Sequence, residues 1–590
     1  MSRQIFILLL LLWAFGSMDA QSNRILIDDD LSDWANQPLL HSDPTGDGGP
    51  TAIDFRLLWA SHDEEFFFLR FEVGAEVLLQ QDNKIAIYID TDNDPNTGFA
   101  INGIGANIRY FPGERTGFVH LNNGTTFSIN HFDIGLVSSP TVSSDEFEIA
   151  IRRDLVFQGI PLFQGSSVQL FFRDNNFLGD QMPNDELGGI SYTFGDNPTA
   201  ALPPYSISRP AADQLRIWSQ NVQNDRLFEP FLQSNFERIA QSIAPDIIAF
   251  QEIYDHTAAE TADLLSTFLP PGPGEQWYFG KEDPDIILLS RYPILAQSKV
   301  SGFIAEQGNG AFLLDLSADH GTQLLVIVAH FPCCNNNEER QLEIDRLLQF
   351  LREAKAGNGP IPLLPNTPIV VTGDMNLVGD RSQQFSLING NIQNESLFGP
   401  DFSPDWDGNP FIDAKLYATH QPLAITWINP SGSFSPGRLD YLLYTASQME
   451  LHNGFSLYTP SLPTDSLNTY NLQANDIFNS ADHLPMVADF SFQLTTSTST
   501  PSRQGTLQLW PNSPNPFAAT TLIPYQLAQA ADVSIHVHNL LGEELAVWKQ
   551  GRQAAGYHQF ELNNRNWGAG IYYYTLRAGQ QQISRKMIIH

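Results

Sequence analysis

The segment P-I-V-V-T-G-D-M-N-L, from Pro368 to Leu377, is the stretch from which the fold can be worked out. Its β-branched run Ile369–Val371 predicts a short buried strand. Asp374 and Asn376 follow two residues apart, and in extended backbone such side chains point to the same face. The pair is suited to holding a metal ion, a water or a phosphate oxygen. G-D-x-N equally suits a tight turn in which both side chains bond their own backbone, so the rest of the chain must decide.

The region around this segment alternates between expected strands and expected helices. The apolar runs predict strands at Leu215–Trp218, Asp246–Phe250 and Leu324–Ala329, and helices at Phe231–Ile243, Ala258–Phe268 and Glu338–Ala354. Such alternation is typical of an α/β domain, which we place at residues 213–492.

Polar residues stand repeatedly at the ends of these apolar runs. They are Asn221, Glu252, His330, Asp374, Asn376, Asp440, Asp482 and His483. Active sites of sheet enzymes commonly assemble at strand ends and in the loops that follow them. Each residue alone could be an ordinary turn, cap or surface residue, but the ordered set predicts a catalytic site.

The motifs that carry these residues resemble, in their order, the endonuclease/exonuclease/phosphatase superfamily with its DNase-I-like fold. They are Q-N-V, P-D-I-I-A-F-Q-E, L-S-R-Y-P-I, A-H-F, G-D-M-N, R-L-D-Y and S-A-D-H-L-P-M, spread over about Leu215 to Phe492. The resemblance implies a four-layer α/β sandwich, with two packed sheets and helices outside. It also implies metal-assisted cleavage of a phosphate ester.

The same resemblance assigns the metal side of the site. Glu252 would supply a hard oxygen ligand to Mg²⁺ or Mn²⁺, which prefer carboxylate and water. Asn221 and Asp482 would complete or orient that shell.

For the phosphate side, the resemblance implies that Asp374 positions or deprotonates the attacking water and that Asn376 donates to the phosphate. His483 would pair with Asp440, whose carboxylate fixes the tautomer of the ring, and would act as base or phosphate ligand. His330 would be a second donor to the phosphate. Which residue is the general base stays open.

Residues 21–196 predict an all-β sandwich, because short aromatic-rich runs alternate with Gly, Asn and Asp clusters. The segments I-D-D-D-L-S-D-W and Y-I-D-T-D-N-D-P-N-T-G resemble family-9-like carbohydrate-binding modules, which implies a glycan as a partner. Asp90, Asp92 and Asp94 alternate like the ligands of a calcium loop, without the bidentate glutamate of an EF-hand, so structural Ca²⁺ and a solvated turn are both open. Trp34 and Trp59 could stack on sugar, although core packing is the ordinary role of an isolated tryptophan.

Both ends of the chain carry export signals. Residues 1–20 predict a signal peptide, because Arg3 precedes the short apolar run Ile5–Phe15 and small residues follow up to Ala20. No other segment predicts a transmembrane helix. In residues 507–590 the segments W-P-N-S-P-N-P-F, N-L-L-G-E-E and G-A-G-I-Y-Y-Y-T-L-R-A-G resemble the type IX secretion sorting domain, with a generic Ig-like module as the alternative. This resemblance implies a small β-sandwich, the secretion machinery as a partner, and a secreted or cell-surface location. Linkers are expected at residues 197–212 and 493–506.

Composition limits the function. The 590 residues are too many for one core, at ~150 residues per domain. The 66 acidic residues outnumber the 31 basic ones and give a net charge of −35, so the surface should repel nucleic acid unless divalent cations intervene. This argues against a protein that reads nucleic-acid sequence by tight binding.

The sequence therefore predicts a secreted, Mg²⁺-dependent phosphodiesterase, with an endonuclease acting on extracellular nucleic acid as the leading hypothesis. One alternative keeps the site but changes the substrate to a phospholipid, as in a sphingomyelinase, or to a small phosphate ester. A lipid substrate would need an exposed aromatic hairpin, for which Phe398–Trp406 is the candidate. The other alternative, a surface adhesin, requires an inactive enzyme domain.

Cys333 and Cys334 are adjacent and could be free thiols or a strained disulfide that stiffens the loop presenting His330.

Overall fold

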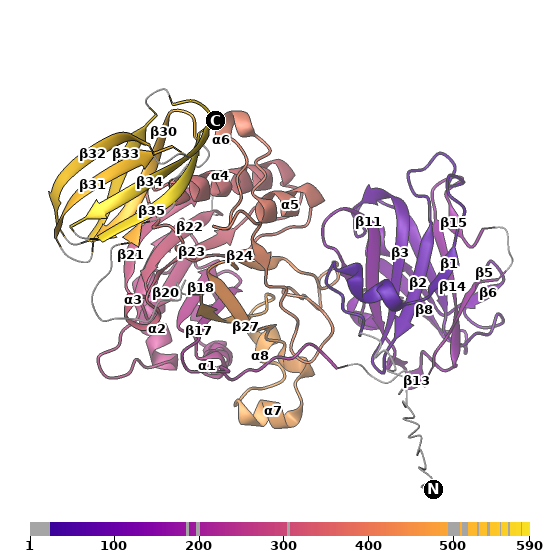
Figure 1. The fold of residues 1–590 in the computed structure, drawn as a ribbon. Helices are drawn as coiled ribbons and strands as arrows, with labels where there is room; N and C mark the ends of the chain where they lie inside the picture. Colours follow the sequence, from indigo (N-terminus) through magenta and orange to yellow (C-terminus); the bar gives the residue numbers. More distant parts are fainter. Residues whose placement is uncertain are drawn as a thin grey trace, which may run out of the picture.

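The computed structural model describes residues 24–184, 188–195, 201–301, 303, 307–493, 508–509, 512, 517–527, 530–539, 543–554, 556–564, 567–579 and 581–589. The predicted signal peptide, all but one residue of the predicted linker 493–506 and most of W-P-N-S-P-N-P-F lie outside these residues. Within the described part of the chain, no helix is long and apolar enough to cross a membrane. The chain forms an N-terminal β-sandwich, a central α/β domain and a C-terminal β-sandwich, as predicted (Figure 1).

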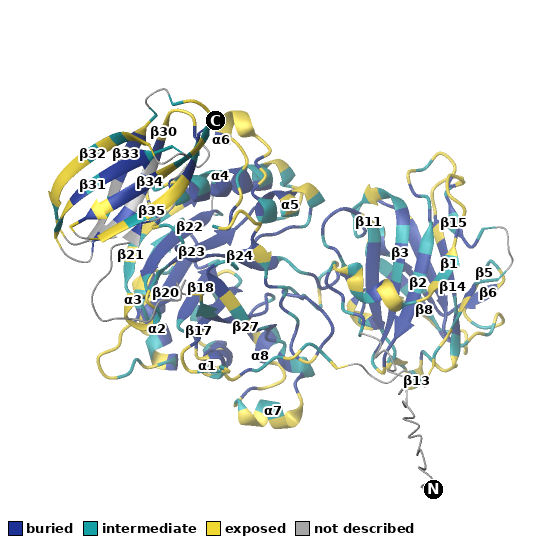
Figure 2. Cartoon of the chain, in the orientation of Figure 1, coloured by how far each residue is buried: buried dark blue, intermediate teal, exposed yellow. Residues whose placement is uncertain are grey.

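The N-terminal sandwich consists of two antiparallel sheets. One has the order β1 (Leu39–Ser42), β2 (Leu57–His62), β3 (Phe66–Val77), β11 (Ser144–Arg152), β10 (Val137–Ser139). The other has the order β15 (Gln181–Met182), β14 (Ser167–Asp174), β4 (Ile85–Asp90), β7 (Ile108–Phe111), β8 (Thr116–His120), β9 (Thr126–Ile129), with β16 (Ile190–Thr193) also paired to β14. The short hairpins β5 (Phe99–Ile101)–β6 (Ile104–Ala106) and β12 (Val156–Phe157)–β13 (Ile160–Pro161) and the 3₁₀ helix η1 (Leu31–Asn36) complete it. Alternate residues of both sheets face each other in an aromatic-rich core. Much of β3 and β11 is coloured as buried in Figure 2.

The two tryptophans considered as sugar platforms have structural roles. Trp34 is 1% exposed, and its Nε1 donates to Glu148 Oε2 at 3.1 Å. The guanidinium of Arg70 lies over the Trp59 ring at 4.1 Å from its centroid. Core packing is therefore the better interpretation of both, and glycan binding stays a prediction.

The acidic loop after β4 forms turns. The carboxylate of Asp90 accepts from the N–H groups of Asp94 and Gly105, each at 3.2 Å, and Asp92 accepts from the hydroxyl of Thr97 at 2.9 Å. Burial, with the neighbouring Asp92, raises the pKa of Asp90 to about 6. Asp94 accepts from the backbone N–H of Asn96 at 3.0 Å. The calcium role of Asp90, Asp92 and Asp94 stays a prediction.

The α/β domain contains two six-stranded sheets. The first has the order β19 (Tyr278–Glu282), β20 (Ile286–Ser290), β18 (Ile247–Gln251), β17 (Leu215–Asn221), β28 (Met486–Phe492), β27 (Met449–Ser456). The second has the order β21 (Ile294–Ser301), β22 (Asn309–Asp315), β23 (Gln323–His330), β24 (Ile369–Asp374), β26 (Asp440–Tyr444), β25 (Ile412–Asp413). The helices are α1 (Gln233–Ile243), α2 (Ala258–Phe268), α3 (Ser317–His320), α4 (Asn337–Lys355), α5 (Arg381–Asn389), α6 (Glu395–Phe398), α7 (Thr464–Thr469) and α8 (Asp476–Ser480).

The four-layer arrangement follows from the two-residue period of the strands. Ile217 and Val370 point between the sheets into a shared core, whereas their neighbours Trp218 and Val371 point outward. Helices α1 and α2 cover the outer face of the first sheet, and α4 covers that of the second. The predicted strands and helices of this domain are confirmed. Helix α1 begins two residues later than expected, which leaves Phe231 outside it and 75% exposed.

The C-terminal sandwich pairs two smaller sheets around its own core. Their orders are β29 (Gln508–Leu509), β30 (Thr520–Leu527), β33 (Gly556–Asn563), and β32 (Glu544–Gln553), β31 (Ala531–His538), β34 (Gly570–Ala578), β35 (Gln581–Ile589). The alternating segments V-S-I-H-V-H and I-Y-Y-Y-T-L-R lie in β31 and β34.

The N-terminal sandwich packs directly on the α/β domain. Ile27 and Leu423 form a parallel bridge, and the backbone of Ile27 bonds the carbonyl of Pro422 and the N–H of Ala424, both at 2.9 Å. Phe66 and Phe68 of β3 belong to the same apolar cluster as the outer face of the first α/β sheet. The two parts therefore share a hydrophobic core.

Candidate active site

The predicted site residues converge because of strand direction. The strands β17 and β18 run parallel, as do β23 and β24, so their carboxyl ends lie at one edge. Strands β26 and β28 run antiparallel to their neighbours, which brings their beginnings to that same edge. In this register His330 pairs with Asp374, and Asp374 pairs with Asp440. Seven of the eight predicted residues are buried or line one cavity at this edge; Asp482 lies next to them.

Asn221 connects the two carboxylates nearest to it. Its Nδ2 donates to Glu252 Oε1 at 2.8 Å and to Asp374 Oδ2 at 3.1 Å, while its Oδ1 accepts from the N–H of Gln223 at 2.9 Å. Asn221 therefore orients the two carboxylates through its amide nitrogen, while its amide oxygen is bonded to the backbone of Gln223. Glu252 has a φ of 63°, an uncommon value for a residue with a Cβ, and its Oε2 accepts from the N–H of Asn224 at 2.8 Å. The backbone and two hydrogen bonds fix Glu252 at the edge of the site.

His483 is held between two carboxylates. Its Nδ1 lies 2.8 Å from Asp440 Oδ2, and its Nε2 lies 3.6 Å from Asp374 Oδ2. Burial alone would lower the pKa of His483, but the negative charges of Asp440 and Asp374 outweigh burial and raise it to about 10. The predicted pairing of His483 with Asp440 is thus present in the structure.

His330 has a parallel arrangement with a partner that the sequence did not indicate. Its Nδ1 lies 2.6 Å from Asp285 Oδ2, and its Nε2 lies 3.7 Å from Asp374 Oδ2 and 3.9 Å from Glu252 Oε1. Burial opposes protonation here too, but the hydrogen bond and charge of Asp285 raise the pKa of His330 to about 9. Asp285 immediately precedes β20, which runs antiparallel to β18. The beginning of β20 therefore lies at the same edge as the end of β18. A carboxylate just before an apolar run is the sequence signal that could have indicated Asp285.

Asp374 forms the turn considered for G-D-M-N and also faces the candidate site. Its Oδ1 accepts from the N–H of Asn376 at 3.1 Å, which is the turn, while Oδ2 faces both imidazoles. Burial raises the pKa of Asp374 to about 6; Asp440 adds to the rise, and His483, His330 and Asn221 oppose it. Asn376 Nδ2 donates to the carbonyl of Phe331 at 2.9 Å and leaves a second amide hydrogen.

Asp482 lies beside the site rather than in its metal-binding groups. Its Oδ2 accepts from Trp427 Nε1 at 3.2 Å. Among the described residues, the candidate metal-binding groups at this edge are Glu252–His330–Asp374 and Asp374–Asp440–His483, each with ligand atoms within 4.8 Å of one another. The metal role of Asp482 therefore stays a prediction.

The donor set fits a hard divalent cation. Carboxylate oxygens of Glu252 and Asp374 lie within 4.8 Å of each other. The carboxylate of Asp440 is also close to the buried Asp374. Such a concentration of buried negative charge is costly unless cations offset it. Oxygen ligands of this kind suit Mg²⁺ or Mn²⁺.

The loop after His330 is held by an arginine, and Cys333 and Cys334 are both free thiols. The buried guanidinium of Arg340 donates to the carbonyls of Pro332 at 3.0 Å and Cys334 at 2.9 Å. The disulfide alternative is absent from the structure, and Arg340 provides the stiffness for which it was invoked.

Two parts of the chain match known protein families. Residues 218–465 match the Endonuclease/Exonuclease/phosphatase family, and residues 513–590 match the Secretion system C-terminal sorting domain. The curated proteins contain no match.

Several solved structures are similar to the central domain. The human nocturnin catalytic domain with bound sulfate is 18% identical, with 48% of this chain and 95% of that chain covered and a TM-score of 0.30. An endonuclease/exonuclease/phosphatase family protein from Leptotrichia buccalis is 14% identical, with 47% and 100% covered and a TM-score of 0.31. Sphingomyelinase C from Streptomyces griseocarneus is 14% identical, with 47% and 99% covered and a TM-score of 0.27.

The sorting domain indicates export through type IX secretion to the cell surface or the extracellular space. The central match agrees with the four-layer fold and with the acidic and imidazole residues at its edge. Residues 218–465 therefore belong to the endonuclease/exonuclease/phosphatase family of metal-dependent phosphoric ester hydrolases.

Proposed function

We propose that this protein is an exported phosphodiesterase that uses Mg²⁺ or Mn²⁺, with extracellular nucleic acid as the substrate expected from its sequence. The observation that carries the proposal is the arrangement around Asp374. Its buried carboxylate faces His483 and His330, and a second aspartate holds each of these rings. Glu252 lies on the same side, linked to Asp374 through Asn221.

Each side chain has a physical role in this proposal. A divalent ion bound through Glu252 would neutralise charge on the phosphate and on the leaving oxygen. Asp374, with its pKa raised to about 6, would orient the attacking water and accept its proton. His483 would direct Nε2–H toward the phosphate, because Nδ1–H is committed to Asp440.

The remaining donors would bind the non-bridging phosphate oxygens. His330 is oriented by Asp285 in the way that His483 is oriented by Asp440. Asn376 has an amide hydrogen left after its bond to Phe331. Three donors around one buried carboxylate can stabilise a phosphate whose charge increases during the reaction.

The lipid alternative loses the feature that supported it. Phe398 is buried, and Trp406 Nε1 donates to the carbonyl of Thr367 at 2.7 Å. Lys355 contacts the faces of Phe402 and Trp406, with its Nζ 5.6 Å and 4.9 Å from the ring centroids. The segment Phe398–Trp406 is thus packed onto α4 and is not an exposed aromatic hairpin.

A panel of substrates tests the proposal. The full-length exported protein would be assayed with Mg²⁺ or Mn²⁺ on plasmid DNA, RNA, sphingomyelin, phosphatidylinositol and a chromogenic phosphate monoester, with His483→Ala as the control. We expect metal-dependent cleavage of a nucleic-acid phosphodiester that EDTA and the substitution both abolish. Release of a lipid head group without any cleavage of nucleic acid would contradict the proposed substrate.

A further inference from the structure

The catalytic cavity has walls from two parts of the chain. It has a volume of about 360 Å³, and the catalytic residues Glu252, His330, Asp374 and His483 line it from the α/β domain. The turn of residues 78–81, between β3 and β4, lines it from the N-terminal sandwich. Pro140 and Thr141, between β10 and β11, extend this second wall.

The turn that forms the wall is rigidly built. Gln81 N–H donates to the carbonyl of Leu78 at 3.2 Å, which closes the turn. The buried Asn83 then donates through Nδ2 to the carbonyls of Leu78 at 2.8 Å, Leu79 at 2.7 Å and Gln81 at 3.1 Å. One buried amide thus fixes the whole turn in a single conformation.

Hydrogen bonds attach this wall to the catalytic loops. Gln80 Oε1 accepts from the N–H of Ser435 at 2.7 Å, and Ser138 Oγ lies 3.0 Å from Ser435 Oγ. Thr141 Oγ1 donates to the carbonyl of Leu377 at 2.8 Å, next to the catalytic Asn376. Ser435 and Leu377 lie in loops that also present catalytic residues. These bonds therefore fix the position of the wall relative to the catalytic edge.

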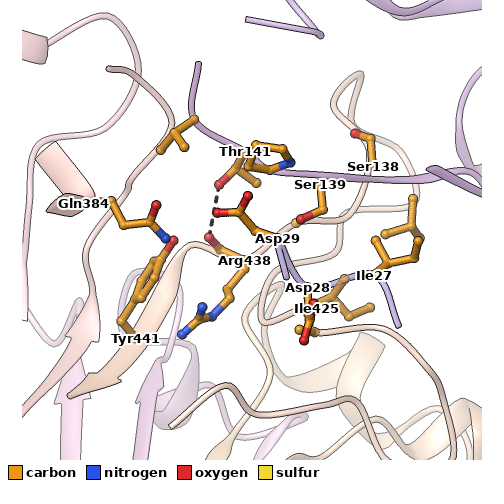
Figure 3. A pocket seen from close by; sticks show the side chains of 15 residues that line it. Ile27, Asp28, Asp29, Ser138, Ser139, Thr141, Gln384, Ile425, Arg438 and Tyr441 are labelled. Carbon is orange, nitrogen blue, oxygen red and sulfur yellow. Dashed lines mark hydrogen bonds between the residues drawn. The ribbon is translucent and has the colours of Figure 1, made fainter. Parts of the chain in front are cut away.

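Further contacts outside the catalytic cavity also attach the N-terminal sandwich to the α/β domain. Figure 3 shows Asp28, Asp29 and Thr141 of the N-terminal part lying together with Arg438 and Tyr441 of the α/β domain. Arg381 donates to Asp29 Oδ1 at 3.2 Å and to Ser144 Oγ at 3.0 Å. Together with the shared apolar core, these contacts make the sandwich part of the enzyme's site rather than a tethered accessory.

The chemistry of the cavity is neutral apart from the catalytic groups. Leu78 and Trp427 present apolar surface, and Phe434 is 38% exposed. None of the described residues that line the cavity is lysine or arginine, and the one guanidinium placed over a lining ring is that of Arg115, 4.3 Å from the Phe434 centroid. A protein that follows a nucleic-acid backbone uses a basic groove, so this cavity suits a single phosphodiester with a flat, uncharged group beside it.

We propose that the N-terminal sandwich forms the substrate-selecting wall of the catalytic cavity, which admits small phosphodiesters and single-strand ends and excludes duplex nucleic acid. This inference rests on the proposed function and narrows its substrate. The base of a nucleotide, or another flat group attached to the phosphodiester, would lie between the turn of residues 78–81 and the aromatic rings of Trp427 and Phe434. The phosphate would then reach the edge formed by Asp374, His330 and His483.

The experiment changes the wall while leaving every catalytic residue in place. Gln81 is half-buried and lines the cavity, whereas Gln164 is an exposed glutamine of the same sandwich outside it. The variants Gln81→Trp and Gln81→Lys would be compared with Gln164→Trp and Gln164→Lys in the full-length protein with Mg²⁺. The substrates are bis(4-nitrophenyl) phosphate, a short single-stranded oligonucleotide and supercoiled plasmid. Thermal unfolding of each variant shows that it is folded.

We expect the wild type to hydrolyse the small diester and the oligonucleotide much faster than it nicks the plasmid. Gln81→Trp should raise KM for the small diester by about tenfold with a smaller change in kcat, because it reduces the binding space rather than the chemistry. Gln81→Lys should lower KM for the oligonucleotide by about threefold, and both Gln164 variants should match the wild type.

Two results would overturn the inference while leaving the proposed function intact. They are plasmid nicking as fast as oligonucleotide cleavage, and Gln81 variants that both behave like their Gln164 controls. Absence of metal-dependent hydrolysis of every phosphodiester would instead overturn the proposed function, and the inference with it.

Discussion

His483 Nδ1 lies 2.8 Å from Asp440 Oδ2, although the two residues are 43 positions apart, and the opposite nitrogen of the ring faces Asp374 at 3.6 Å. Asp440 begins β26, and His483 lies just before β28, in the other sheet. The pair therefore bridges the two sheets at the edge where the candidate site residues meet. His330 repeats the pattern with Asp285 on one side and Asp374 on the other.

Asp440→Asn should lower kcat by about a hundredfold or more, because an amide can present its N–H to the ring and favour the wrong tautomer. KM should change little, since Asp440 lies behind the ring. Steady-state kinetics on a small phosphodiester measures both constants, with circular dichroism as the control for folding. A kcat within a factor of two of the wild type would show that the orientation of His483 does not matter.

Asp285→Asn tests the residue that the sequence did not indicate. It removes the charge that raises the pKa of His330, and it weakens the bond from the N–H of Glu252, which Asp285 accepts at 3.2 Å. We expect a loss of kcat/KM of about tenfold to a hundredfold and a higher metal requirement. Asp283→Asn, two residues earlier and paired with Lys299, is the matched control. Equal effects of the two substitutions would mean that Asp285 acts only through the stability of the loop.

The success and the failure of sequence-based prediction have the same physical cause. Asn221, Glu252, His330 and Asp374 follow apolar runs, so strand ends showed where they would meet. Asp440 also begins a strand, but it lies in R-L-D-Y, one of the motifs that carry the family resemblance. Asp285 lies in none of these motifs, so its place at the edge becomes visible only when the antiparallel pairing of β20 is known.

The second wall of the cavity depends on contacts that no local pattern records. Gln80 and Ser435 are 355 residues apart and meet only because two separate domains dock on each other. A glutamine in a polar turn looks like any solvated loop residue in the sequence. Within the predicted linker at 197–212, the structure places Ile207 in the apolar core of the α/β domain.

Removal of the metal should abolish activity, and Asn221 should set how tightly the metal binds. Asn221→Ala frees Glu252 and Asp374 from their shared amide, so the Mg²⁺ concentration for half-maximal activity should rise by about tenfold to a hundredfold. Saturating metal should restore much of kcat, because the carboxylates remain. Metal titrations after EDTA treatment measure this, with Gln223→Ala as a neighbouring control. An unchanged metal requirement would remove Asn221 from the site.

Cys333 and Cys334 should titrate as two free thiols in the native protein. Burial, with the adjacent Cys334, raises the pKa of the Cys333 thiol to about 12, so it should react with a disulfide reagent more slowly than the exposed Cys334. The double variant Cys333→Ser/Cys334→Ser should keep its activity within about twofold, because Arg340 holds the loop. Arg340→Met should lower both thermal stability and activity. Loss of activity in the serine variant with full activity in Arg340→Met would reverse these roles.

The metal-free protein should lose stability as the pH rises from neutral to alkaline. The folded state holds the pKa of His483 at about 10 and that of His330 at about 9, whereas both are about 6.5 in an unfolded chain. Between these values the folded state binds more protons than the unfolded state. The stabilisation is therefore complete below pH 6.5 and is lost as the pH rises through 9 to 10.

In EDTA, the Tm of the α/β domain should fall by about 5 °C or more between pH 7 and pH 10, and the fall should be smaller in His483→Gln and in Asp440→Asn. His120→Gln is the control, because burial lowers the pKa of His120 and leaves it neutral throughout this window. Differential scanning calorimetry can follow this transition, which the N-terminal sandwich should join because it shares an apolar core with the α/β domain. A Tm that stays level across this range in the wild type would mean that the two imidazoles are not held as cations by their carboxylates, and the role of His483 as a proton donor to the phosphate would lose its basis.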